Sequence, residues 1–133
     1  MPTEYPYQII LAAKYKPLER IEEKLTADAA RPWYNETLCQ VNDSVVRLAV
    51  VKGEYHWHNH QREDEFFYVV EGRLLIDLID PQDPATTEDN PRTIDLGPRQ
   101  GVVIPKGVMH RPRAPERTVM LMVETDTIRP TGS

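Results

Sequence analysis

GEYHWHNHQREDEFFYVVEG, residues 53–72, carries three histidines at every second position: His56, His58 and His60. Alternate side chains of a β-strand point to the same face, so His58 and His60 could approach one ion together. The apolar run that follows opens with Glu65 and has the composition of a second strand. A hairpin between the two runs would return Glu65 to the histidines. The stretch therefore predicts a site of two imidazoles and one carboxylate.

The fourth histidine of the chain, His110, lies in a separate segment far from the first three. Imidazole nitrogens combined with one carboxylate suit a divalent transition metal such as zinc, iron, nickel, manganese or copper. Calcium would need more oxygen ligands than this set offers. We therefore expect one divalent transition metal, whose identity the ligand types leave open.

Short apolar runs separated by turn residues follow the first third of the chain, which is the pattern of an all-β domain. We expect strands at residues 37–41, 45–51, 54–60, 65–70, 73–79, 93–96, 101–104, 109–112 and 118–124. So many short strands with no helices between them predict an antiparallel barrel or jelly roll. In the run over residues 73–79, alternate residues form one apolar face, and Leu75 and Ile79 place apolar side chains on the opposite face as well. This indicates a sheet covered on both sides, as in a sandwich or a dimer interface.

One segment near the N-terminus has helical periodicity instead. Its apolar positions, at helical spacing among charged residues, are Leu18, Ile21, Leu25 and Ala29. We expect one amphipathic helix over residues 18–30, with this stripe packed on the body of the domain. The flanking segments, up to Pro17 and from Thr125, are expected to be irregular and loose. The single domain then divides into an N-terminal extension and helix, a barrel and a C-terminal tail, at residues 1–35, 36–125 and 126–133.

Composition excludes several classes of partner. The chain has 133 residues and a formal net charge of −5 with no long basic run, so we expect no nucleic-acid partner. No stretch approaches the ~20 apolar residues of a membrane span, so we expect no membrane partner. The single cysteine, Cys39, cannot form an internal disulfide, and the N-terminus lacks the pattern of a signal peptide. These features predict a cytoplasmic protein.

Two spaced motifs resemble those of the cupin superfamily, in particular the small single-domain cupins described as phosphomannose-isomerase-like. The motifs are His58-x-His60-x4-Glu65-x6-Gly72 and Pro105-x-Gly107-x2-His110. The resemblance implies an all-β cupin jelly-roll barrel with one short N-terminal helix and one metal near its centre. It implies these metal ligands: His58, His60, Glu65 and His110. It also implies open coordination positions for water or substrate, and a homodimer.

A second register would pair His56 and His58 with Glu63. Gly72 favours the first register, because its spacing fits the motif and a turn between two strands needs the backbone freedom of glycine. His56 and Glu63 then remain as candidate catalytic residues that move protons, since an imidazole titrates near neutral pH. The alternative for His56 is a hydrogen-bonded histidine beyond the metal.

Three functions are compatible with these residues. The first is a metal-dependent enzyme of isomerase or dioxygenase type that acts on a small polar molecule. The second is a non-catalytic cupin that binds or senses a small ligand through its metal, and the third is a storage or structural role with a closed site. An open coordination position separates the third from the others, and turnover separates the first from the second. Because the fold hosts many functions, the sequence leaves the choice between them open.

Overall fold

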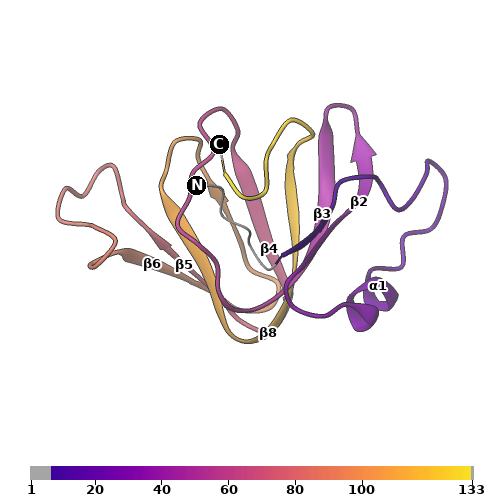
Figure 1. Ribbon diagram of the computed structural model, residues 1–133, viewed down its shortest axis with the longest axis horizontal. Coiled ribbons are helices and arrows are strands. Elements are labelled where there is room, and N and C mark those ends of the chain that lie inside the picture. Colours follow the sequence, from indigo (N-terminus) through magenta and orange to yellow (C-terminus); the bar gives the residue numbers. More distant parts are fainter. Residues whose placement is uncertain (1–6, 133) are drawn as a thin grey trace.

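The computed structural model describes residues 7–132, which form β-strands and one short helix (Figure 1). The elements are β1 (Gln8–Ile10), α1 (Glu23–Ala29), β2 (Tyr34–Val41), β3 (Ser44–Glu54), β4 (Glu65–Glu71), β5 (Leu74–Leu78), β6 (Arg92–Leu96), β7 (Gly101–Ile104) and β8 (His110–Thr125). The all-β prediction with one N-terminal helix is therefore confirmed.

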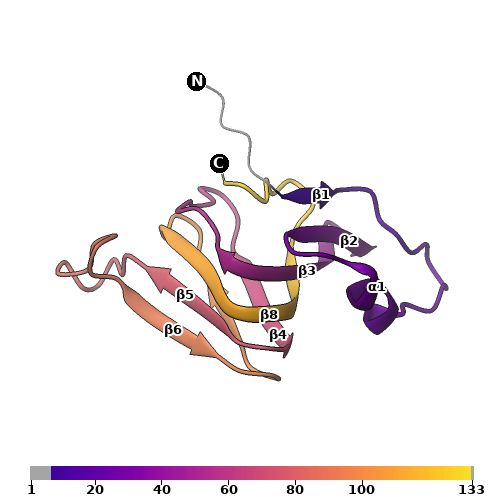
Figure 2. The same ribbon diagram turned by 60° about the horizontal axis from the view of Figure 1, so that its bottom comes forward.

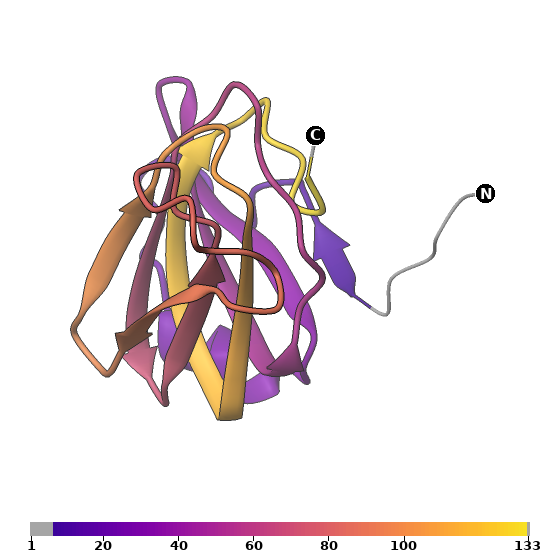
Figure 3. The same cartoon turned by 90° about the vertical axis from the view of Figure 1, so that its left-hand side faces the viewer.

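The long strand β8 connects the two parts of the sheet. Its C-terminal part lies between β3 and β4, while its N-terminal end pairs with β5, which in turn pairs with β6. Figure 3 is viewed from the β5 and β6 side, with β8 beside them. The remaining strands follow the order β1-β2-β3-β8-β4-β7, and hydrogen bonds do not close this path into a continuous barrel. All pairings are antiparallel except β1 with β2.

The residues of β3 alternate between two separate apolar clusters. Ala49 and Val51 belong to the inner cluster, which contains Phe67 and lies between the two parts of the sheet. Leu48 and Val50 belong to an outer cluster that packs under α1. Because both faces of β3 are covered, its central residues read as a continuous apolar run instead of an alternating one. The strand that is covered by apolar groups on both faces is therefore β3, whereas the sequence predicted this for residues 73–79.

The predicted helix over residues 18–30 is wrong in length and in its buried face. The helix spans only Glu23–Ala29, and it buries Thr26 and Ala27 against the sheet. Most of the expected apolar stripe is exposed: Leu18 by 106%, Ile21 by 41% and Leu25 by 67%. Helical spacing alone does not fix which face packs, because a helix of seven residues contacts the sheet through only two side chains.

Three strand predictions and two predictions of irregular segments are also corrected. The expected strand over residues 54–60 does not form, since β3 ends at Glu54 and only His58 pairs further on. The runs 109–112 and 118–124 are one strand, β8. The segment before Pro17, expected to be irregular, contains β1, while residues 1–6 lie outside the described part. The tail expected to be loose packs on the body, with Ile128 buried.

Figure 2 shows β1 and the C-terminal segment at the same edge of the molecule, away from β6. In β5, the second face carries a half-buried Leu75 and a buried Asp77, so it is only partly apolar. Homodimerisation, the cytoplasmic location and the division into three segments stay predictions. Within residues 7–132, no helix is long and apolar enough to cross a membrane.

Candidate metal centre

The two sequence motifs meet through backbone hydrogen bonds. His58 and His110 exchange N–H···O bonds of 3.0 and 2.9 Å, and the Gly107 N–H donates to the His60 carbonyl at 2.8 Å. Gly107 has a φ of 84°, a conformation that glycine adopts without strain. The loop with His58 and His60 is therefore fixed against the strand that carries His110, although it is not itself a regular strand.

The structure brings the four predicted ligands together. Glu65 is the first residue of β4 and points to the same side as the three histidines. One ligand atom from each of the four residues lies within 4.8 Å of the others, and all four side chains are buried: His58, His60, Glu65 and His110. Ligands about 2.1 Å from one ion lie at most about 4.2 Å apart, so each needs to move only a few tenths of an ångström.

Backbone carbonyls fix the tautomers of two of these histidines. The Nδ1–H of His58 donates to the His56 carbonyl at 3.0 Å, and the Nδ1–H of His110 donates to the Val108 carbonyl at 2.9 Å. Each Nε2 is then left with a lone pair for a metal. Such support of a ligating imidazole through its other nitrogen is usual in metal sites.

Several buried atoms of the cluster have no hydrogen-bond partner. They are both ring nitrogens of His60, Nε2 of His110 and Oε1 of Glu65. Buried polar atoms are nearly always paired, because leaving one unpaired costs about 1–3 kcal/mol. A bound cation would satisfy lone pairs on nitrogen and oxygen together, whereas more hydrogen-bond acceptors would not. The residues present therefore fit a metal ion.

The pKa shifts favour the protonation states that a metal needs. Burial, and secondarily the neighbouring His110, lowers the pKa of His58 to about 3, so its imidazole is neutral. Burial by itself would raise the pKa of Glu65, but its neighbours Glu124, His110 and His60 outweigh this and hold the pKa well below its ordinary value. Glu65 is thus an ionised carboxylate beside the neutral imidazole of His58.

Two further buried ionisable side chains lie behind Glu65, and the sequence reasoning did not place them there. Nε of Arg47 lies 2.9 Å from Oε1 of Glu124, and both side chains are almost completely buried. Burial, together with the adjacent Glu65 carboxylate, raises the pKa of Glu124 well above its ordinary value. A signal was present, since Arg47 has the same strand parity as the inward-facing Ala49 of β3.

His56 and Glu63 lie outside the cluster. The hydroxyl of Tyr7 is 3.2 Å from Nδ1 of His56, whose Nε2 donates to the Thr131 carbonyl at 2.7 Å. Glu63 is on the exposed side, where it accepts a hydrogen bond from Thr127 at 3.2 Å. Their proposed part in catalysis stays a prediction. The hydrogen bonds of His56 agree with the alternative in which it is held beyond the metal.

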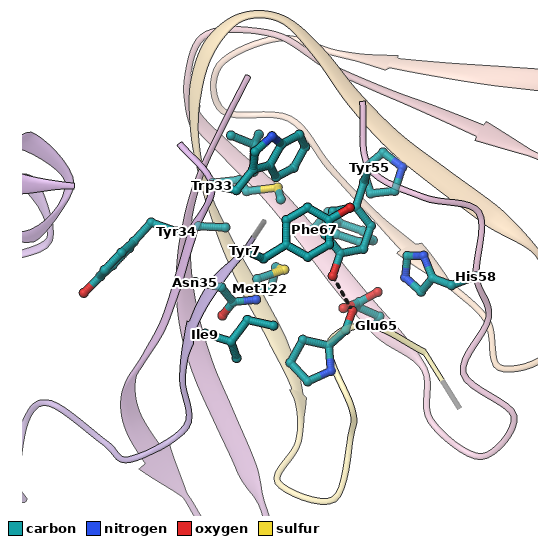
Figure 4. A pocket seen from close by; sticks show the side chains of 15 residues that line it. Tyr7, Ile9, Trp33, Tyr34, Asn35, Tyr55, His58, Glu65, Phe67 and Met122 are labelled. Atoms are coloured by element: carbon teal, nitrogen blue, oxygen red, sulfur yellow. Dashed lines mark hydrogen bonds between the residues drawn. The ribbon is translucent and has the colours of Figure 1, made fainter. Parts of the chain in front are cut away.

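The cluster opens into a cavity on one side. His58 and Glu65 line this cavity together with aromatic and methionine side chains. Figure 4 shows these side chains converging from several strands. Tyr34 also belongs to the lining, but in the figure its ring points away from the other labelled side chains. The candidate metal site is thus not fully enclosed by its four side chains.

Comparison with known proteins now defines the class. Residues 44–125 match the Cupin_2 family, described as the cupin domain, and these residues include both motifs and all four clustered side chains. Because the match covers more than half of the chain, the protein belongs to the cupin family. Its predicted membership is confirmed.

Individual relatives agree with this class. An uncharacterized protein, YdbB of Bacillus subtilis, is 46% identical over 90 residues, which cover 68% of this chain and 71% of that protein. A cupin-2 domain protein from Shewanella frigidimarina has a TM-score of 0.66 and 30% identity over 81% of this chain and 94% of its own. Hydroquinone 1,2-dioxygenase from Sphingomonas sp. TTNP3, solved with 4-hydroxybenzoate bound, has a TM-score of 0.59 and 18% identity over 71% of this chain and 28% of its own. The last likeness concerns the fold alone.

Proposed function

We propose that this protein is a metal-dependent enzyme of isomerase or dioxygenase type that acts on a small molecule. One observation carries the proposal: the cluster with unpaired buried ligand atoms also forms part of a cavity wall. A structural metal site is closed by its ligands, whereas a catalytic one keeps a position for water or substrate. The shared wall at His58 and Glu65 supports the open kind.

The residues of the chain have distinct roles in this proposal. Those that would hold the metal are His58, His60, Glu65 and His110. A metal here would polarise a carbonyl or hydroxyl oxygen or, if it is iron, support reactions with O₂. The His56 and Val108 carbonyls keep the imidazoles oriented, while Phe67, Met120 and Met122 exclude bulk water from the cavity.

A non-catalytic cupin that binds or senses a small ligand is the second candidate. The position of the two predicted proton carriers favours it, because neither His56 nor Glu63 lines the cavity within the described residues. Both candidates need the metal and the cavity. Turnover of a ligand by the metal-loaded protein would distinguish them.

The test is the metal content of the purified protein, measured by plasma mass spectrometry beside three variants. We expect one equivalent in the wild type and almost none in His58→Ala and His110→Ala. His56→Ala is the matched control, because it removes an imidazole from the same segment and should keep the metal. A folded wild-type protein that holds no metal, even after reconstitution, would refute the proposal.

A further inference from the structure

The cavity beside the cluster has an aromatic and sulfur-rich lining. Trp33 and Tyr55 form one part of its wall, and Phe67, Met120 and Met122 form another. Apart from tyrosine hydroxyls, the polar side chains of the lining are Asn35 from β2 and two members of the four-residue candidate metal site, which we call the metal cluster: His58 and Glu65. Ligands that carry a hydroxyl on nearly every carbon, as sugars do, would bury many groups without partners here. The lining therefore suits a flat apolar body with one polar end.

A phenol ring of the chain itself already lies in this cavity. The ring of Tyr7 stacks on Tyr55 with a centroid distance of 4.3 Å, and it meets Trp33 edge-on at 5.4 Å (Figure 4). These are the two arrangements that aromatic pairs prefer. The walls formed by Tyr55 and Trp33 are thus shaped to hold a six-membered aromatic ring.

The space that Tyr7 leaves is too small for a second ring. The cavity has a volume of about 40 Å³, which is room for roughly three water molecules. A ligand of ring size can enter only if a side chain of the lining moves. Tyr7 is the best candidate, because it directly precedes the short edge strand β1, whereas Phe67 and Met120 belong to the inner core.

The side chain of Tyr7 is held by its ring contacts and by the contact of its hydroxyl with Nδ1 of His56, while its backbone lies beside a short edge strand. Tyr7 directly precedes β1, a strand of three residues that pairs along one edge with β2 alone. Short edge elements open at a small fraction of the free energy of global unfolding. We therefore expect displacement of Tyr7 to break its contact with His56 and to leave the sheet and the metal cluster in place.

We propose that this cavity takes a phenol-type aromatic ligand, whose ring replaces that of Tyr7 against Tyr55 and Trp33. The hydroxyl of the ligand points toward His58 and Glu65, the end of the cavity formed by the metal cluster. The direction of the hydroxyl rests on the proposed metal function. The binding of the ring rests on the aromatic walls alone, so the two can fail separately. In this arrangement Tyr7 is a plug that competes with the ligand.

The test is calorimetric titration with phenol, using cyclohexanol as a non-aromatic probe of the same ring size. Wild type, Tyr7→Ala and Tyr7→Phe are each titrated in zinc-loaded and metal-free form. Tyr7→Ala should bind phenol about tenfold more tightly than wild type, the value of one aromatic pair. Tyr7→Phe keeps the ring and should bind phenol as the wild type does. Cyclohexanol should bind every form weakly.

Equal phenol affinity in Tyr7→Ala and Tyr7→Phe would overturn the plug, and equal affinity for phenol and cyclohexanol would overturn the aromatic preference. If the wild-type protein binds one equivalent of zinc, neither of these results contradicts the proposed metal function. Conversely, the wild-type protein could fail to bind zinc while Tyr7→Ala still binds phenol more tightly than wild type. That result would refute the metal function alone and leave the aromatic binding in place. If Tyr7→Ala does not fold, Tyr7→Leu removes the aromatic ring while keeping an apolar side chain, and it decides by the same comparison.

Discussion

Two groups of buried charged side chains lie in this fold, and they differ in whether their polar atoms have partners. On β5, both carboxylate oxygens of Asp77 accept hydrogen bonds. The donors are Nη2 of Arg111 at 2.8 Å, Nε of Arg113 at 2.8 Å and the Thr93 hydroxyl at 2.8 Å. We call this group the Asp77 cluster. Both oxygens of its carboxylate are paired within the chain, so this carboxylate needs no ligand.

The four side chains of the metal cluster are all buried, but several of their ligand atoms lack such partners. His60 and His110 keep ring nitrogens without partners, and so does Oε1 of Glu65, which lies 3.4 and 3.5 Å from the two imidazoles. The comparison shows that burial of charged groups does not by itself identify a functional site. Unpaired ligand atoms that face one another do, because the chain supplies nothing else to stabilise them.

The largest expected difference between the two clusters is the response to metal. Zinc at about a thousandfold above its dissociation constant should raise the free energy of unfolding by about 4 kcal/mol, because the ion binds the folded state only. Urea unfolding with zinc and with a chelator measures this. Asp77→Ala should keep the same zinc increment, whereas Glu65→Gln should lose it. An increment that survives in Glu65→Gln would place the ion elsewhere.

The next effect is the stability of the Asp77 cluster. Asp77→Ala should lower the free energy of unfolding by about 3 kcal/mol, since it leaves two partly buried arginines without their carboxylate. Urea unfolding of the metal-free protein measures the change, and unaltered zinc stoichiometry is the control. A loss below about 0.5 kcal/mol would mean that solvent replaces the carboxylate without penalty.

Acid should weaken the Asp77 cluster in a defined window. Burial alone would raise the pKa of Asp77, but hydrogen bonds from Arg113, Arg111 and Thr93 outweigh it and lower the pKa from 3.8 to about 2. Between these values the unfolded state binds more protons, so the stabilisation is present above the upper value and is lost toward the lower one. The loss is about 2 kcal/mol. Stability curves against pH should show it in the wild type, and the prediction fails if Asp77→Ala has the same slope.

The smallest effect is expected at Glu124, behind the metal cluster. Burial and the adjacent Glu65 carboxylate raise the pKa of Glu124 and so favour its protonated form, for which an amide is a close substitute. Glu124→Gln should change the free energy of unfolding by less than about 1 kcal/mol, while zinc affinity falls by up to about tenfold because Glu65 loses part of its support. Denaturation and zinc competition measure the two quantities. A loss of several kcal/mol would show that Glu124 is ionised beside Arg47.

The local sequence predicted the residues of the candidate metal site more accurately than the helix and strands around it. The spacing of His58, His60, Glu65 and Gly72 holds in the structure, and Gly72 has a φ of 94° in the turn after β4, as a turn glycine should. The reason given for the histidine spacing was wrong, because His58 lies in a short bridge and His60 in a loop. Backbone bonds from the second motif, and not strand alternation, bring these side chains together.

The apolar pattern was informative for strands and misleading for the helix. Residues 101–104 form β7 with the predicted bounds, because alternation and the flanking glycine and proline are local signals. The stripe at Leu18, Ile21 and Leu25 is exposed, since the segment before Glu23 does not continue the helix. Which apolar side chains are buried depends on the surface opposite them, and no local pattern contains that surface.

The sequence by itself determined the fold class and the four residues of the candidate metal site, because each of the two motifs consists of residue types at fixed short spacings. Only the tertiary structure decided which charges are balanced. Arg47 and Glu124 come from different strands that pair side by side, and Tyr7 reaches Tyr55 across the fold from the chain end. These side chains are paired by contacts between residues distant in sequence. Such contacts decide whether a side chain belongs to an ion pair, to the candidate metal site or to the plug of the cavity.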